Sequence, residues 1–256
     1  MPIQYVDFEE AQKRDGLRMV VVSGVPSPWG EAAKGILHVK QIPWVAVRLD
    51  TSNAGLTAWT GEASGPVAMY GDERPRPGWA EILLLAERLA PKPALLPDSP
   101  EERALAMGLS HEICGQQGLG WCRRNQGVHA ALAGTGGFPK GVAAYLGPKY
   151  GYRAEEAASY AARVVEILGM LAARLHAQAE KGSSFYLGSA LSAVDLYSAA
   201  FLALFQPLPP AQCPMPELMR AGFETLDAAT EKALDPILLA HRDRIYAEHL
   251  ELPLSL

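Results

Sequence analysis

The stretch VVVSGVPSPWGEAAKGIL, residues 20–37, joins a strand to a helix and indicates how the first part of the chain folds. Residues 18–23 (RMVVVS) contain a continuous β-branched run, which is typical of a strand covered on both faces. Apolar residues then recur at helical spacing until Ile42-Pro43, and residues 44–49 (WVAVRL) predict a second strand. A strand, a helix and a strand in close succession predict a parallel βαβ unit.

Ser27 stands where the first strand gives way to the helix. A serine followed by a proline, here Pro28, commonly begins a helix, with the serine as N-cap and the proline at the first helical position. A helix N-terminus also carries partial positive charge, which stabilises an anion. Ser27 therefore has two interpretations: a helix cap alone, or a group that also holds a reactive anion.

The rest of the first 90 residues predicts a small α/β domain. We expect residues 1–16 to be an irregular N-terminal extension. Residues 66–70 (PVAMY) predict a short strand, and residues 78–89 predict a helix. Four prolines within residues 91–100 then indicate a linker, which we place at 91–99.

From residue 100 onward the pattern is helical and lacks strand-like alternation. The expected helices lie at roughly 100–124, 154–180 and 193–204, with two more within 215–249. The predicted fold class is therefore α/β + all-α. A mixed-sheet domain over residues 1–90 precedes an all-helical domain over residues 100–256, in a helical-bundle arrangement.

The composition favours a globular protein without nucleic-acid or membrane partners. Of the 256 residues 49% are apolar and 20% are charged, and the formal net charge is −5. No cluster of lysine and arginine would neutralise a run of phosphates, and no apolar run reaches the ~18 residues of a membrane helix. The acidic start, MPIQYVDFEE, has no apolar signal region, so we expect a cytoplasmic location.

The cysteines and histidines do not predict a redox or metal centre. The three cysteines form no C-x-x-C motif, so they predict neither a disulfide framework nor a redox pair. His111-Glu112 begins a zinc-helix pattern, but Gly115 stands where the second histidine would be needed. We therefore expect no metal site.

Two stretches resemble the cytosolic glutathione transferase superfamily. Residues 27–43 (SPWGEAAKGILHVKQIP) fit the family's Ser/Cys, Pro, aromatic and amphipathic-helix pattern, which ends in Ile/Leu-Pro. Residues 188–195 (GSALSAVD) fit the G-x-x-x-[ST]-x-x-D box that begins the buried helix of the family's second domain. In that capping box Ser192 caps the amide of Asp195, and the Asp195 carboxylate returns to the helix start. The resemblance implies a thioredoxin-like first domain followed by a helical second domain.

The resemblance also implies a catalytic serine. Ser27 would donate its hydroxyl to the sulfur of glutathione, whose thiol has a reference pKa near 8.5 and is mostly protonated at neutral pH. Gly65-Pro66-Val67 corresponds to the family's segment with a cis-proline, which presents backbone to glutathione. The implied glutathione-binding residues are Trp29, Gly65, Pro66, Val67 and Trp79, and the implied second-substrate residues are Trp121, Tyr145 and Tyr150.

The activity implied is that of a glutathione transferase-like enzyme. It would activate the thiol of glutathione, its co-substrate, for attack on a small hydrophobic electrophile, a reaction used in detoxification. The resemblance further implies a homodimer, with helix 78–89 and the helix after Ser99 lining the interface.

One departure from the family pattern leaves other functions open. Gly78-Trp79 stands where the family has a Glu/Gln-Ser pair for the γ-glutamyl end of glutathione, with Glu81 nearby and Arg74 or Arg76 as a substitute contact. A non-catalytic binding or scaffold protein of the same fold is therefore one alternative. A thiol-disulfide exchange protein is another, disfavoured because a serine replaces the cysteine that this chemistry needs.

The glycine-rich segment GTGGFPKG, residues 134–141, is the remaining motif. It lies between helices, follows no strand and has Lys140 out of register for a phosphate-binding loop. We expect a functional insertion or a lid here, with phosphate binding as the weaker alternative.

Overall fold

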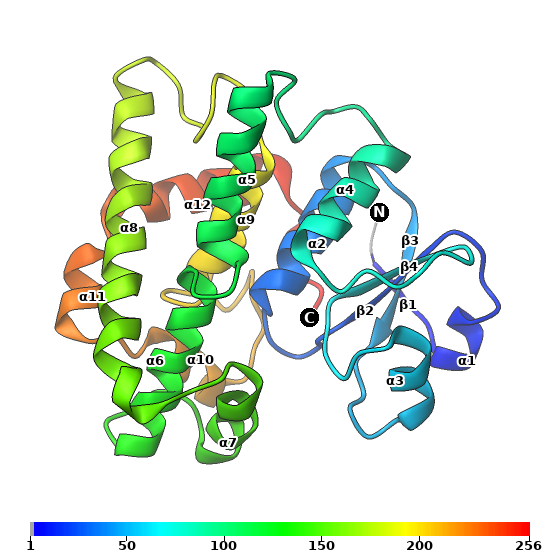
Figure 1. The fold of residues 1–256 in the computed structure, drawn as a ribbon, viewed down its shortest axis with the longest axis horizontal. Helices are drawn as coiled ribbons and strands as arrows, with labels where there is room; N and C mark the ends of the chain where they lie inside the picture. Colours follow the sequence, from blue (N-terminus) through cyan, green and yellow to red (C-terminus); the bar gives the residue numbers. More distant parts are fainter. Residues whose placement is uncertain (1–2) are drawn as a thin grey trace.

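The computed structural model describes residues 3–256, in which a small sheet domain lies beside a larger helical domain (Figure 1). The strands are β1 (Gln4–Tyr5), β2 (Leu17–Val21), β3 (Trp44–Arg48) and β4 (Val67–Tyr70), in the order β1-β3-β2-β4. Strands β2 and β3 are parallel, whereas β2 and β4 are antiparallel. The mixed sheet and the parallel βαβ unit are thus confirmed.

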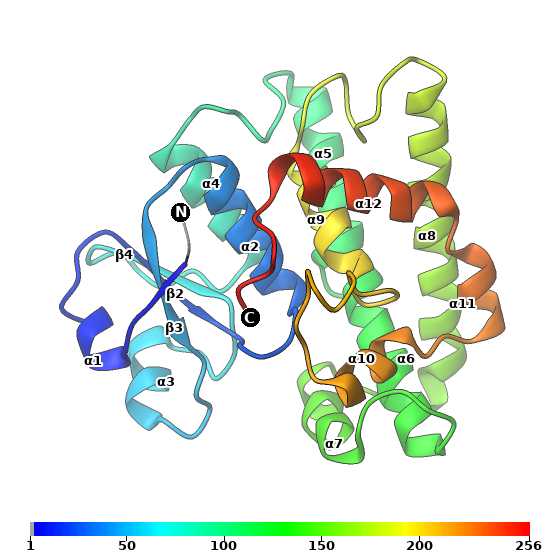
Figure 2. The ribbon, with the colours of Figure 1, turned by 180° about the vertical axis from the view of Figure 1, so that it is seen from behind.

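The β-branched run of β2 is buried on both sides, as its sequence predicts. Met19 and Val21 face helices α2 (Pro28–Val39) and α4 (Trp79–Leu89), and Val20 belongs to the core on the opposite face. Helices α1 (Phe8–Ala11) and α3 (Ala54–Thr60) lie on that opposite face (Figure 2). Alternate residues of one strand therefore supply two separate cores.

Within residues 3–16 the expected irregular extension instead contains a short strand and a short helix, whereas residues 1–2 lie outside the described part of the chain. Strand β1 pairs in parallel with the outer edge of β3, and α1 follows it. The Tyr5 hydroxyl donates to the Ser255 carbonyl at 3.1 Å, and the Arg48 guanidinium lies 4.2 Å from the centre of the Tyr5 ring. A two-residue strand is too short to show periodicity, and its partners are distant in sequence.

The helical domain contains more elements than the sequence predicts. They are α5 (Pro100–Cys114), α6 (Leu119–Ala133), α7 (Lys140–Lys149), the 3-10 turn Ala154–Glu156, α8 (Ala157–Ala179), α9 (Ala193–Leu202), α10 (Glu217–Glu224), α11 (Ala228–Ala233) and α12 (Pro236–His249). Instead of one helix over 100–124, the chain breaks at residues 115–118, where Gln117 adopts a positive φ of 62°. Helix α7 was not expected. No helix of residues 3–256 meets the length and hydropathy needed to cross a bilayer.

Helix α9 is the centre of the molecule. All of its residues are buried, and it packs against α2, α5 and α12 (Figure 1). Contact between α9 and α2 brings the helix that begins beside Ser27 against the second domain. The two domains therefore share one hydrophobic core.

The proline-rich linker is held in place by polar contacts. Lys40 Nζ donates to the carbonyls of Ala90 and Pro93, at 2.7 and 2.8 Å. The Glu87 carboxylate accepts from the Leu95 amide, and the Leu95 carbonyl accepts from the Ala193 amide at the start of α9. The linker thus fixes the position of one domain against the other.

The glycine-rich segment 134–141 is anchored to the helical domain through Phe138, and its expected role as an insertion or lid stays a prediction. Phe138 is buried against Phe223 of α10, with ring centres 6.0 Å apart. A Cβ on Gly137 would lie 2.4 Å from the Gly127 carbonyl oxygen, and one on Gly222 would lie 2.8 Å from the Gly137 oxygen. These glycines therefore permit close approach of backbone to backbone.

Candidate functional site

Ser27 lies at the N-terminus of α2, where the loop after β2 ends. Its side chain does not cap the helix, and within residues 3–256 its hydroxyl has no hydrogen-bond partner, although only 8% of the residue is exposed. The Ser27 carbonyl accepts the first helical bond, from the Glu31 amide at 2.8 Å. The first backbone amides of a helix have no hydrogen-bond partner within the helix, which makes its N-terminus partially positive. The free Ser27 hydroxyl lies at this end of α2.

The register of the sheet places the cis-proline segment beside this loop. Val67, the first residue of β4, pairs with Val20 near the end of β2. A Cβ on Gly65 would lie 3.1 Å from the Val20 carbonyl oxygen, and the Gly65-Pro66 peptide is cis, as the resemblance implies. The serine loop and the cis-proline segment therefore lie at the same end of the sheet.

Trp29 turns toward the helical domain. Its indole Nε1 donates to the Cys114 carbonyl at 2.9 Å, and its ring stacks on Tyr150 with centres 5.8 Å apart. An edge contact with Phe201, at 4.8 Å, joins it to α9. Trp29 is thus built into the contact between the domains, and its predicted contact with glutathione stays a prediction.

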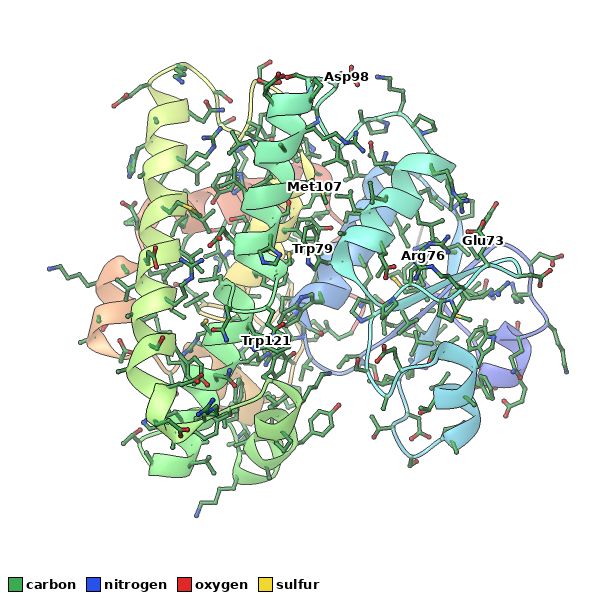
Figure 3. All side chains as sticks on the ribbon, viewed as in Figure 1. Glu73, Arg76, Trp79, Asp98, Met107 and Trp121 are labelled. Carbon is green, nitrogen blue, oxygen red and sulfur yellow. The ribbon has the colours of Figure 1, made fainter. Side chains whose placement is uncertain are left out.

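The polar groups at the start of α4 form hydrogen bonds with one another. The Glu81 carboxylate accepts from the Gly78 amide at 3.2 Å and from Arg74 at 2.6 Å, and the Arg74 bond lowers the pKa of Glu81. Arg76 is likewise paired with Glu73 at the edge of the sheet domain (Figure 3). The two arginines expected as substitute contacts therefore already have carboxylate partners.

Trp79 lies between the domains, where Figure 3 shows it beside α5. Its ring makes an edge contact with Tyr197 at 5.5 Å and lies 6.4 Å from His111. The Tyr197 hydroxyl also donates to the Trp79 carbonyl at 3.1 Å. These contacts give Trp79 a packing role, and its predicted contact with glutathione remains untested.

The expected second-substrate residues are brought together on α6 and α7. Trp121 makes an edge contact with Tyr150 at 4.9 Å, and Tyr150 in turn stacks on Trp29. Tyr145 is 49% exposed, and Lys149 Nζ lies 5.7 and 5.8 Å from the centres of the Tyr145 and Tyr150 rings. The aromatic set thus runs from the first turn of α2 to the surface.

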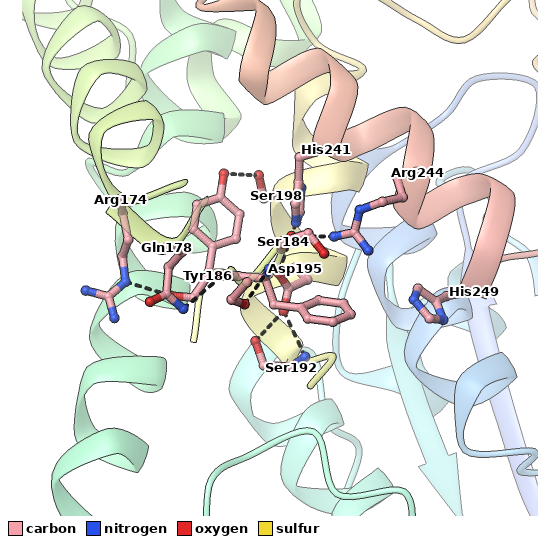
Figure 4. A network of polar contacts seen from close by, with 12 residues as sticks. Arg174, Gln178, Ser184, Tyr186, Ser192, Asp195, Ser198, His241, Arg244 and His249 are labelled. Carbon is pink, nitrogen blue, oxygen red and sulfur yellow. Dashed lines mark hydrogen bonds and ion pairs between the residues drawn. The ribbon is translucent and has the colours of Figure 1, made fainter. Parts of the chain in front are cut away.

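The capping box is present and belongs to a larger network (Figure 4). Asp195 Oδ2 accepts from the Ser192 amide at 2.8 Å and from the Ser192 hydroxyl at 2.6 Å. Its Oδ1 accepts from the Tyr186 amide at 2.9 Å and contacts His241 Nε2 at 3.0 Å. Sequence reasoning missed His241, because no local pattern links α12 to the start of α9.

A second buried ion pair lies on α2, close to the end of the chain. Lys34 Nζ donates to Glu31 Oε1 at 2.8 Å and to the Ser255 carbonyl at 2.7 Å. Burial raises the pKa of Glu31, and the positive charge of Lys34 opposes this rise. This pair binds the chain around residue 255 to the sheet domain.

The cysteines are buried small side chains. Burial raises the pKa of the Cys114 thiol well above its usual value and that of Cys122 to about 11, so both are protonated at neutral pH. Within residues 3–256 no group of three His, Cys, Asp or Glu side chains is placed to hold a metal ion. Neither finding adds a redox or metal function to the site.

The described cavities lie away from Ser27. One lies between α2 and residues 250–255, a second beside Pro207 and Arg220, and a third between residues 94–98 and 187–192. None of these three is lined by Ser27, Pro66 or Tyr150. The candidate site is therefore defined by the approach of the Ser27 loop to the Gly65-Pro66 segment at one end of the sheet.

Comparison with known proteins identifies the fold. No family model matches the chain, and no curated protein matches it by sequence. Among solved structures, beta-etherase LigF from a Sphingobium strain has a TM-score of 0.63 at 15% identity, with 91% of this chain and 95% of that chain covered. Rice glutathione transferase GST1, in complex with glutathione, has a TM-score of 0.59 at 19% identity and 94% coverage of both chains.

A third similar structure also holds a glutathione-like ligand. A glutathione S-transferase of Methylobacterium radiotolerans, in complex with glutathione sulfonate, has a TM-score of 0.58 at 18% identity, with 91% of each chain covered. The chain therefore has the glutathione transferase fold: a thioredoxin-like domain followed by a helical domain.

Proposed function

We propose that the protein is a glutathione transferase-like enzyme that activates the thiol of glutathione through Ser27. The observation that carries the proposal is the free Ser27 hydroxyl at the N-terminus of α2, beside the cis Gly65-Pro66 segment. Similar folds crystallised with glutathione support glutathione as the co-substrate.

The proposed chemistry is a displacement at carbon. The Ser27 hydroxyl donates a hydrogen bond to the glutathione sulfur, which stabilises the thiolate after its proton has passed to solvent. The thiolate attacks the electrophilic carbon of a small hydrophobic substrate, a carbon–sulfur bond forms, and the leaving group departs with its electron pair. A hydroxyl donor and the helix terminus together provide about 1 to 3 kcal/mol of thiolate stabilisation.

A non-catalytic binding protein is the second candidate. The observation that favours it is the start of α4, where Arg74 and the Gly78 amide are already bonded to Glu81. These groups are then less able to hold the γ-glutamyl end of glutathione. Thiol-disulfide exchange has less support, because Ser27 replaces the cysteine and Cys114 is buried and protonated.

Calorimetry with glutathione and a turnover assay with a generic electrophile distinguish these candidates. The enzyme proposal expects both glutathione binding and thioether formation above the uncatalysed rate. Weak glutathione binding without turnover would favour the binding protein. Absence of both would refute the use of glutathione.

A homodimer through α4 and α5 is also proposed. Leu84 of α4 is 44% exposed and Leu105 of α5 is 40% exposed, so each of the two helices presents an apolar side chain to solvent in the single chain. Light scattering should give twice the 27.5 kDa chain mass at micromolar concentration. Leu84→Arg should restore the single-chain mass, whereas Leu218→Arg on α10 serves as an exposed control.

A cytoplasmic, detoxifying role is the part of the proposal that rests on the resemblance and the composition alone. Cell fractionation tests the location. A survey of small hydrophobic electrophiles as substrates tests the detoxifying role.

A further inference from the structure

Within residues 3–256, two cations of α6 and α7 form no ion pair: the exposed Lys149 and the buried Arg124. Lys149 is an exposed residue at the end of α7, and its ammonium lies 5.7 and 5.8 Å from the ring centres of Tyr145 and Tyr150. The negative charge of Glu62, from the segment before the cis-proline, raises the pKa of Lys149, but within residues 3–256 the two side chains form no ion pair. Lys149 therefore combines an exposed ammonium with two neighbouring tyrosine rings.

Arg124 of α6 is the second cation, and it is buried. Its guanidinium lies between the rings of Phe138 and Phe223, 5.4 and 5.1 Å from their centres, and Nε has no hydrogen-bond partner in the described chain. Buried charges are usually paired, yet no carboxylate among residues 3–256 pairs with Arg124. Its positive charge is therefore left to act on its surroundings.

Tyr150 does not supply the missing negative charge. Burial raises the pKa of its hydroxyl, and the neighbouring Arg124 reverses this only in part, so Tyr150 is a neutral phenol at neutral pH. Burial lowers the pKa of Lys149, and the positive charge of Arg124 lowers it further, so the two cations repel each other. An anion bound here would relieve that repulsion.

We propose that the surface formed by Tyr145, Lys149 and Tyr150 selects a second substrate that is an aromatic carboxylate. The aromatic ring would lie against the exposed Tyr145 ring, above the buried Tyr150, and the carboxylate would pair with the Lys149 ammonium in the positive field of Arg124. Trp29 lies two residues after Ser27 in the chain, and its ring stacks on Tyr150. It therefore connects this surface to Ser27. The inference rests on the proposed function for its reaction but not for its binding site.

The catalytic test compares 4-(chloromethyl)benzoate with its methyl ester. With either compound, the glutathione thiolate displaces chloride and forms a thioether, so the two differ chiefly in charge. We expect a higher kcat/KM for the carboxylate, and Lys149→Met should lower the carboxylate-to-ester ratio by about fivefold, the scale of an exposed ion pair. Lys140→Met, at the start of the same helix, should leave the ratio unchanged.

A binding test separates this inference from the proposed function. Quenching of tryptophan fluorescence by 1-naphthoate should exceed that by 1-naphthalenemethanol, and Lys149→Met and added salt should both weaken the naphthoate effect. This result in a protein without turnover would support the anion surface and refute the enzyme proposal. Equal binding of the two compounds, or a naphthoate affinity that Lys149→Met does not change, would overturn the inference whatever the turnover result.

Discussion

Replacement of Ser27 by alanine separates a catalytic serine from a helix cap. The Ser27 hydroxyl makes no capping bond, so Ser27→Ala should change the free energy of unfolding by less than about 0.5 kcal/mol. Asn53 provides the matched control, because its side chain does cap α3 through the Leu56 amide at 3.0 Å. Asn53→Ala should cost about 1 kcal/mol. Urea denaturation of both variants measures the difference.

The effect of Ser27→Ala on rate follows from the thiol pKa. A thiol with a pKa near 8.5 is about 3% thiolate at pH 7, whereas one lowered by about 1.5 units is about half thiolate. Loss of the hydroxyl should therefore reduce turnover at pH 7 by about 15-fold, with most of the rate recovered toward pH 9. Turnover measured with saturating glutathione across this pH range is the assay.

An unchanged rate and an unchanged pH profile in a still active Ser27→Ala protein would refute the reasoning. The activating donor would then have to be another group near the α2 N-terminus, first Ser23 and the backbone amides of Trp29 and Gly30. A large loss of stability would instead show that the serine hydroxyl has a structural partner.

Three further substitutions test the buried contacts. Asp195→Ala should lower the free energy of unfolding by about 3 kcal/mol or more, because it leaves several buried donors without an acceptor; equal urea midpoints would contradict this. Trp29→Phe removes the bond to the Cys114 carbonyl and should cost about 1 kcal/mol, measured by thermal unfolding. Lys34→Met leaves buried Glu31 unpaired and should cost about 3 kcal/mol at neutral pH. Because burial already raises the pKa of Glu31, this loss should shrink as acid protonates the carboxylate, and a pH-independent loss would count against it.

The local features of the fold could be predicted from the sequence. The β-branched run of residues 18–23, the Ser-Pro at the start of α2 and the capping box of α9 are signals within a few residues of one another. Strand alternation, helix periodicity and capping depend on neighbours in the chain, so they can be predicted without knowing which elements pack against them. The parallel pairing of β2 with β3 follows because a βαβ crossover strongly constrains its topology.

Other features depended on contacts between distant segments. Strand β1 is defined only by its pairing with β3, and the glycines of residues 134–141 gain their role only from the backbone of α6 and α10. The sequence also suggests one helix over 100–124, whereas the break at 115–118 includes a contact with a distant element, since Arg163 of α8 donates to the Gln117 carbonyl at 3.4 Å. Periodicity over short windows does not contain this information.

The sequence by itself determined the two-domain order, the position of Ser27 at a helix start and the presence of a cis-proline counterpart. Only the tertiary structure decided that the Ser27 hydroxyl is free, that Trp29 bonds to the second domain and that His241 contacts Asp195. The physical reason is that a side chain's partner depends on which surfaces meet when the domains pack. The partners of the Trp29 indole and of His241 are therefore residues tens of positions away, whereas backbone conformation is set largely by adjacent ones.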